Sequence, residues 1–167
     1  MQVVIYHEVR PESLDTVLRE GIKRSDKGEK SDSVVQRADE CLDDRRPQDL
    51  AARGLSRRAV VYGYLSSGDK VIDIRNGGAV DVHEFTAQRD LVLLRITADS
   101  ATSFVSDLDA YDAVKMCTAS GADDTLLARL AERYWARIVP LDEYDGSYRR
   151  PEVMVTSDVE PQDIEVV

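Results

Sequence analysis

Four polar residues of this chain lie in stretches that otherwise have the composition of β-strands. Glu152 follows a proline and precedes Val-Met-Val in RRPEVMVTSD, His7 lies in VVIYHEV, and Tyr62 and Tyr64 alternate in AVVYGYL. Carboxylate, imidazole and phenol groups can stabilise charge or move a proton. The alternation places both tyrosines on one face of their strand. Each residue also has a plainer interpretation, with Glu152 a solvated residue at the mouth of an edge strand and the others packing residues.

Other common sites are not indicated by the sequence. The two histidines, His7 and His83, and the two cysteines, Cys41 and Cys117, do not have the spacing of a zinc site. The aspartates of residues 107–112 lack the glycine and final glutamate of a calcium loop. No G-x-S-x-G, Walker or G-x-G-x-x-G motif is present. We therefore predict no metal site, no P-loop and no Rossmann-type glycine-rich loop.

The elements that must position these residues follow from the hydrophobic pattern. Helical spacing and a glycine stop predict a helix that begins at Glu12 or Ser13 and ends at Gly21. A second amphipathic helix is predicted over residues 123–138, capped by Asp123 or Asp124. β-Branched and aromatic runs predict strands over 3–9, 59–65, 70–74, 91–98, 151–159 and 164–167.

The remaining stretches have weaker signals. Residues 25–34 are polar and are predicted to be loop, while 41–58 have helical character interrupted by Pro47 and Gly54. Helical character is also present over 108–117, and 138–149 is predicted to be a connector with a short extended piece.

The whole chain, 1–167, is expected to be one α+β domain with a twisted, mostly antiparallel sheet and a few helices. Residues 91–98 are the most apolar strand candidate, which predicts a central place in the sheet. The sequence contains no run of 18 apolar residues and its start lacks the features of a signal peptide. With only two distant cysteines, the chain is expected to be cytoplasmic and without a membrane partner.

These stretches together resemble the ADP-ribosyltransferase fold. Members open with a strand carrying Tyr-His and then a helix of the form x-x-L-x-x-I-L-x-x-G-[IL]; here the order reads IYHEV and SLDTVLREGI. The DNA-modifying toxin group ends on a strand that begins with its catalytic glutamate, in a context like [KR]-x-x-E-[FV]-[LM]-V. Here that context reads RRPEVMV, followed by DVEPQDI, which is similar to the family's closing segment. The RNA 2′-phosphotransferases share the opening motif more distantly.

The resemblance implies an enzyme that cleaves the nicotinamide–ribose bond of NAD and transfers ADP-ribose to an acceptor. It implies a catalytic set of His7, Glu152 and a tyrosine, which is either Tyr62 or Tyr64. The transition state is oxocarbenium-like, so a carboxylate would balance the developing charge. Tyr6 and His7 would contact the dinucleotide.

Arginines are expected to hold the pyrophosphate, because a guanidinium grips phosphate oxygens in a fork. These arginines are equally plausible as surface charge. The candidates are Arg45, Arg46, Arg57 and Arg58.

Two alternatives stay open at this point. A catalytically degenerate member of the same fold would bind a nucleotide or a protein partner without cleaving NAD. An unrelated α+β domain would scatter His7, the tyrosines and Glu152 over the molecule. The acceptor is open among nucleic acid, protein, small molecule and water, and the frequent use of this fold in toxin–antitoxin pairs would imply an antitoxin partner.

The chain is strongly acidic, with 32 Asp and Glu against 22 Lys and Arg and a net charge of −10. Such a charge disfavours diffuse binding to phosphates and keeps a protein soluble by repulsion. We interpret it as adaptation to a salt-rich, halophilic cytoplasm, where the Debye length falls to about 3 Å near 1 M salt.

Raising KCl from about 0.1 M to about 1 M is therefore expected to raise the melting temperature, because screening removes self-repulsion of the folded state. Thermal unfolding followed by circular dichroism measures it. Most of the increase in melting temperature should occur before KCl reaches about 1 M, because the charges are largely screened at that concentration. A melting temperature that does not change with salt would contradict the halophilic interpretation.

Overall fold

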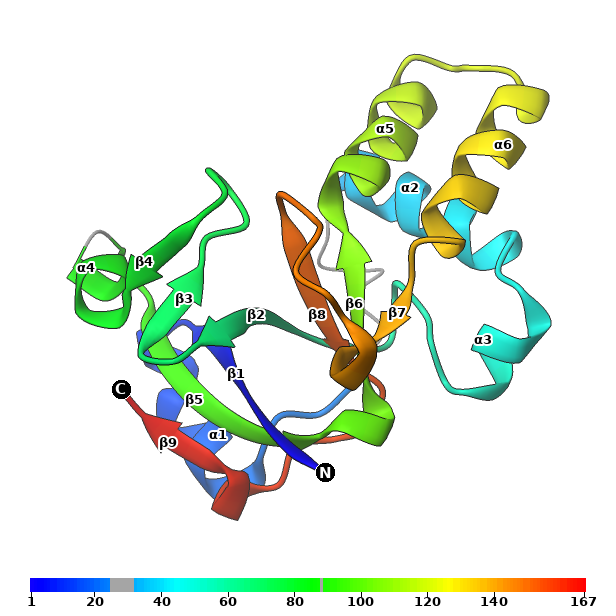
Figure 1. Cartoon of the computed structure of the whole chain (residues 1–167). Coiled ribbons are helices and arrows are strands. Elements are labelled where there is room, and N and C mark those ends of the chain that lie inside the picture. Colours follow the sequence, from blue (N-terminus) through cyan, green and yellow to red (C-terminus); the bar gives the residue numbers. More distant parts are fainter. Residues whose placement is uncertain (25–31, 88) are drawn as a thin grey trace.

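The structure is a computed structural model in which residues 1–24, 32–87 and 89–167 are described (Figure 1). Its strands are β1 (Gln2–Val9), β2 (Val61–Ser67), β3 (Lys70–Ile72), β4 (Ala79–Asp81), β5 (Val92–Asp99), β6 (Ser103–Asp107), β7 (Val139–Pro140), β8 (Pro151–Val155) and β9 (Ile164–Val166). Its helices are α1 (Leu14–Glu20), α2 (Ser33–Asp44), α3 (Gln48–Ala52), α4 (Val82–Ala87), α5 (Leu108–Ala119) and α6 (Asp124–Trp135).

The strands form one open antiparallel sheet, so the predicted α+β class is confirmed. Its order is β7-β6-β8-β2-β1-β5-β9, with β3 and β4 branching from β2 as a short hairpin. The central place predicted for residues 91–98 is wrong, because β5 is second from one end, between β1 and β9. Its apolar composition has another cause: Leu94 and Ile96 belong to one buried cluster, while Leu93 belongs to another.

Three helices gather at one end of the sheet (Figure 1). Helices α2, α5 and α6 contact one another and share a buried cluster with Phe104 of β6 and Met154 of β8. At the other end, β3, β4 and α4 bury a smaller cluster that includes Tyr6, Tyr64 and Phe85. One face of the sheet is therefore packed against α2, α5 and α6 at one end and against β3, β4 and α4 at the other, and the middle strands lie between these two groups.

Aspartate caps account for where the longer helices begin. Asp123 accepts a hydrogen bond from the Leu126 amide at 2.8 Å, which confirms one of the two predicted caps of α6. Asp32 caps α2 in the same way, and that helix begins at Ser33, inside the stretch predicted to be loop. The rest of that loop prediction, residues 25–31, lies outside the described residues.

Within the described part of the chain, none of the helices has both the length and the apolar composition needed to cross a membrane.

Gly21 ends α1 and lies against the segment that follows β8. Its φ is +78°, and a Cβ atom built there would lie 2.2 Å from the Val159 carbonyl oxygen. That carbonyl also accepts a hydrogen bond from the Ile22 amide at 2.9 Å, so it cannot move freely. The glycine therefore fixes how the first helix approaches the C-terminal part of the chain.

Gly21→Ala is expected to lower the free energy of unfolding more than Gly121→Ala does. Both positions have a left-handed φ, but a Cβ at Gly121 would meet no atom within 4 Å. The clash at Gly21 should add about 1–3 kcal/mol. Urea denaturation of the two variants measures this difference, and equal losses would contradict the close approach.

Candidate functional site

A cavity of about 210 Å³ opens where β1 and β2 diverge. The two strands pair only at Ile5 with Leu65 and at Tyr6 with Tyr64. Beyond Tyr6 the strands separate, and the side chains at the gap come from β1, β2, β8 and the turn after β3. The lining residues are His7, Glu8, Tyr62, Gly63, Tyr64, Ile74 and Glu152. The four residues with candidate chemistry in the sequence therefore come together here.

His7 is held in the gap by a hydrogen bond to the main chain of β2. Its Nδ1 lies 2.6 Å from the Tyr62 carbonyl oxygen. A carbonyl can only accept, so Nδ1 carries the proton in this contact. Gly63 allows the strands to approach just before they part, because a Cβ there would lie 2.9 Å from the Tyr6 carbonyl oxygen. The tautomer and orientation of the imidazole are thus set by the split of the sheet.

Glu152 is not a solvated residue at an edge strand, so that plainer interpretation is wrong. Strand β8 lies between β6 and β2, and Glu152 pairs in register with Ser106 on one side and Tyr64 on the other. The residue is only 6% exposed. The pleat places its side chain on the same face as the two tyrosines of β2.

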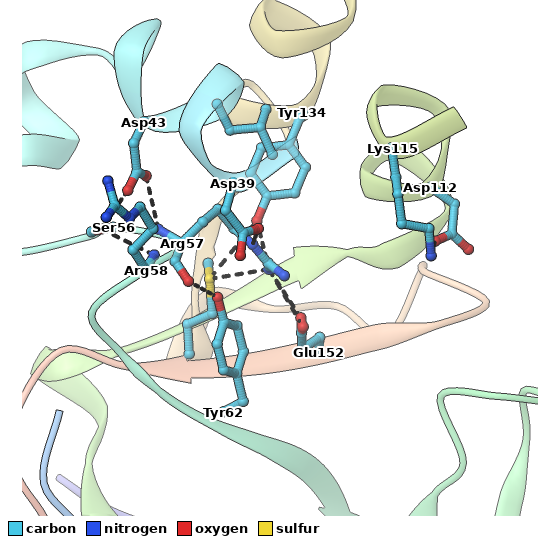
Figure 2. A network of polar contacts seen from close by, with 12 residues as sticks. Asp39, Asp43, Ser56, Arg57, Arg58, Tyr62, Asp112, Lys115, Tyr134 and Glu152 are labelled. Atoms are coloured by element: carbon cyan, nitrogen blue, oxygen red, sulfur yellow. Dashed lines mark hydrogen bonds and ion pairs between the residues drawn. The ribbon is translucent and has the colours of Figure 1, made fainter. Parts of the chain in front are cut away.

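The Glu152 carboxylate contacts a buried arginine (Figure 2). Arg57 is 4% exposed and donates from Nη1 to Glu152 Oε1 at 3.0 Å and to the Tyr134 hydroxyl at 3.1 Å. Its Nε donates to Asp39 Oδ1 at 3.3 Å. The Tyr62 hydroxyl donates to the Arg57 carbonyl oxygen, so this tyrosine presents its ring to the cavity and its hydroxyl to the network.

Aromatic rings complete the surroundings of the guanidinium. The Arg57 Cζ lies 4.1 Å from the centroid of the Tyr111 ring and 4.7 Å from that of Tyr62. Such cation–π contacts are strongest where water is excluded. A single side chain between α3 and β2 is therefore joined to α2, α5, α6, β2 and β8.

The pKa values follow from this burial. Loss of water alone would lower the pKa of Arg57, but Glu152, the hydroxyls of Tyr134 and Tyr62, and Asp39 raise it well above its ordinary value. The guanidinium is therefore always charged. Burial raises the pKa of Asp39, with the Arg57 charge opposing that effect. Burial also raises the pKa of Tyr134 to about 12, so its hydroxyl is a neutral group.

The other residues expected at a dinucleotide site lie outside the cavity lining. Tyr6 is buried on β1 beneath α4, in the cluster at the far end of the sheet. Arg45 donates to the Cys41 carbonyl oxygen at 3.1 Å and pairs with Asp124, and Arg46 donates to the Leu55 carbonyl oxygen. Both of these arginines therefore connect segments at the end of the sheet where α2, α5 and α6 gather.

Arg58 follows Arg57 in the chain and lies beside Asp43 and Ser56 in Figure 2. Its amide donates to the Ser56 hydroxyl at 3.1 Å. It is half-buried and is not among the residues that line the cavity.

Four larger cavities, of about 590, 530, 380 and 370 Å³, lie elsewhere and have fewer candidate catalytic groups. One of about 590 Å³ is lined mainly by apolar residues of β1 and β2 and by the loop around Tyr144. Another, of about 530 Å³, lies between α3 and α6 and includes Arg45 and Trp135. Among the described residues, none that line the four larger cavities is a histidine or one of the four polar strand residues, so the smaller cavity is the candidate site.

No match was found when the chain was compared with protein-family models, curated proteins and solved structures. The site is therefore interpreted from its own geometry.

Sequence reasoning did not select Asp39 or Tyr134, and it gave Arg57 a different role. Asp39 lies in a helix that was only partly predicted, and Tyr134 belongs to the apolar face of α6. Arg57 was chosen for phosphate binding, and its pairing with Glu152 spans 95 residues of sequence. A long-range pairing of this kind has no local signal. Glu8 also lines the cavity, but consecutive residues of a strand point to opposite faces, so its position next to His7 gave no signal.

Replacing Arg57 by methionine is expected to lower the free energy of unfolding by about 3–5 kcal/mol, because Glu152 and Asp39 would stay buried without a cation. Burial raises the pKa of Asp39 and the Arg57 charge opposes that rise, so without the cation the pKa of Asp39 in the folded state lies further above that of the unfolded chain. The folded state then binds more protons, so the defect should shrink as the pH falls from about 7 towards about 5.

Urea denaturation at the two pH values measures both effects. Arg95→Met is the matched control, because Arg95 makes an exposed ion pair with Glu165 and should lose at most about 1 kcal/mol. Equal losses in the two variants would show that Arg57 is not the structural centre of this region.

Proposed function

We propose that the cavity binds the nicotinamide end of NAD and that this chain is an NAD-dependent ADP-ribosyltransferase with an ADP-ribosyltransferase-like fold. One observation carries the proposal: His7, Tyr62, Tyr64 and Glu152, which come from three different strands, line one cavity. These are the residue types that the resemblance of the two chain ends implies for such an enzyme. An unrelated use of these residues would not require them to meet.

The chemistry of the lining residues supports the proposal. Cleavage of the nicotinamide–ribose bond builds positive charge on the ribose, and Glu152 is the carboxylate that would balance it. The tyrosine rings offer flat surfaces for a flat heterocycle, and the His7 ring is fixed by its bond to the Tyr62 carbonyl. Arg57 holds the Glu152 carboxylate in one place, which is the preorganisation that electrostatic catalysis requires.

The size of the cavity limits what enters it. Pockets for whole drug-sized ligands are about 300–1,000 Å³, so a cavity of about 210 Å³ accommodates one ring and its near surroundings. The adenosine end of NAD would therefore lie outside it.

A second function has one observation in its favour. The Glu152 carboxylate is buried and already bonded to Arg57, so a ribose hydroxyl would have to share it or displace the guanidinium. A chain in which Arg57 keeps the carboxylate would bind a nucleotide without cleaving it. This is the catalytically degenerate alternative, and the two functions differ in nicotinamide release.

We expect both wild type and Glu152→Gln to bind NAD and only wild type to release nicotinamide. Glutamine keeps an acceptor for Arg57 but cannot balance a developing positive charge. Calorimetric titration in high salt measures binding, and chromatography of nicotinamide measures cleavage. Glu165→Gln is the control, because Glu165 is an exposed carboxylate on β9 and should leave release unchanged.

Each outcome separates the alternatives. Binding by both proteins without any release would favour the degenerate binder. Release that persists in Glu152→Gln would remove Glu152 from the catalytic role. Absence of NAD binding by the wild type would contradict both functions.

A further inference from the structure

The cavity has a second carboxylate besides Glu152. Glu8 follows His7 on β1, and its side chain lines the same cavity. Its side chain is only 12% exposed. A carboxylate buried to this degree is retained only where other groups compensate for the loss of water.

Arg89 and Tyr64 supply that compensation for Glu8. Arg89 donates to Glu8 Oε1, and the Tyr64 hydroxyl donates to Glu8 Oε2 at 2.7 Å. Burial, together with the bond to Glu8, raises the pKa of Tyr64 to about 12, so the hydroxyl is a neutral donor. The Arg89 guanidinium is itself held over the Phe85 ring, with Cζ 3.8 Å from the ring centroid. Glu8 is therefore fixed in place before any ligand arrives.

The charges on the two sides of the cavity do not cancel. Arg89 also pairs with Asp73 at 3.6 Å, so this arginine faces two carboxylates. Burial would raise the pKa of Asp73, but hydrogen bonds from the Arg75 amide and Asn76 and the Arg89 charge hold it below its usual value. Asp73 is thus ionised at neutral pH, and the Glu8 cluster has an excess negative charge.

The opposite side of the cavity has the same composition. Arg57 lies between Glu152 and Asp39, at 3.0 and 3.3 Å. Among the described residues that line the cavity there are two glutamates and neither a lysine nor an arginine. A small cavity between two such clusters attracts positive charge more strongly than the same groups would in bulk water, because the surrounding protein has a low dielectric constant.

The tyrosine rings add to this preference. Tyr62 and Tyr64 line the cavity, and the face of an aromatic ring attracts a cation. A site with carboxylates on two sides and phenol rings between them binds a flat cation more tightly than a neutral ring of the same shape.

We propose that Glu8 is a specificity-determining residue that makes this cavity select a cationic heteroaromatic ring over its neutral counterpart. The inference rests on the proposed function and deepens it. Within NAD the oxidised nicotinamide ring is a pyridinium cation, while the reduced ring and the released nicotinamide are neutral. Glu8 would therefore favour entry of the oxidised dinucleotide and departure of the cleaved base.

The probes are 1-methylnicotinamide, which is a cation, and nicotinamide, which is neutral and has the same ring and amide. Ligand-observed NMR titration gives the two dissociation constants for wild type. We expect the cation to bind on the order of tenfold more tightly, the ratio for one partly screened charge contact. Glu8→Gln should reduce this ratio to about one, and Glu8→Asp should retain most of it.

Glu165→Gln is the matched control. It removes an exposed carboxylate that lies outside the cavity lining, so the preference should remain. Thermal unfolding of each variant verifies that it is folded. Equal affinity of the wild type for the two rings would overturn the inference, and so would a preference that Glu8→Gln leaves intact.

The nicotinamide-release measurement keeps this inference distinct from the proposed function. Release of nicotinamide from NAD without a preference for the cationic probe would overturn the role of Glu8 alone. A preference for the cation without release would support the role of Glu8 and contradict the transferase.

Discussion

The burial of the Arg57 guanidinium is the constraint on which the rest of the site depends. A charge can be taken out of water only if carboxylates and other acceptors surround it. Here they come from α2, α6 and β8, and the Tyr111 ring of α5 covers one face of the guanidinium. The helical end of the molecule and the strand that carries Glu152 are therefore joined through one side chain.

A second constraint is the point at which β1 leaves β2. Strands that stayed paired would direct their hydrogen bonds to one another and leave no space for a ligand. Here the pairing ends after Tyr6, the His7 ring bonds to the Tyr62 carbonyl, and a cavity opens beside Glu152. On either side of that opening one arginine faces two carboxylates, Arg57 on one side and Arg89 on the other, so carboxylates outnumber arginines around the cavity.

Much of the fold could be predicted from local patterns. The strand with His7, the helix that ends at Gly21 and the Asp123 cap all have signals within a few residues, and the structure has them. Strand β6 was missed because its five residues include two serines and an aspartate and are buried on both faces. The position predicted for β5 was wrong because an apolar strand indicates only that both of its faces are buried. Both faces of β5 are buried although the strand is second from one end of the sheet.

The residues of the candidate site could likewise be predicted from the sequence only in part. The sequence selected His7, Tyr62, Tyr64 and Glu152 because polar residues in strand-like runs are conspicuous, and these residues meet. It did not select Asp39, Tyr134 or Arg89, and it assigned Arg57 to phosphate rather than to Glu152. The contacts of these residues join segments far apart in the chain. Only the fold determines which arginine meets which carboxylate.

A crystal structure of Glu152→Gln grown with NAD tests the central claim most directly. The account predicts the nicotinamide ring inside the cavity beside His7, Tyr62 and Tyr64, with residue 152 at the adjoining ribose. It also predicts that the adenosine end lies outside the cavity. A dinucleotide bound in the larger cavity between α3 and α6, with the space beside His7 empty, would contradict it.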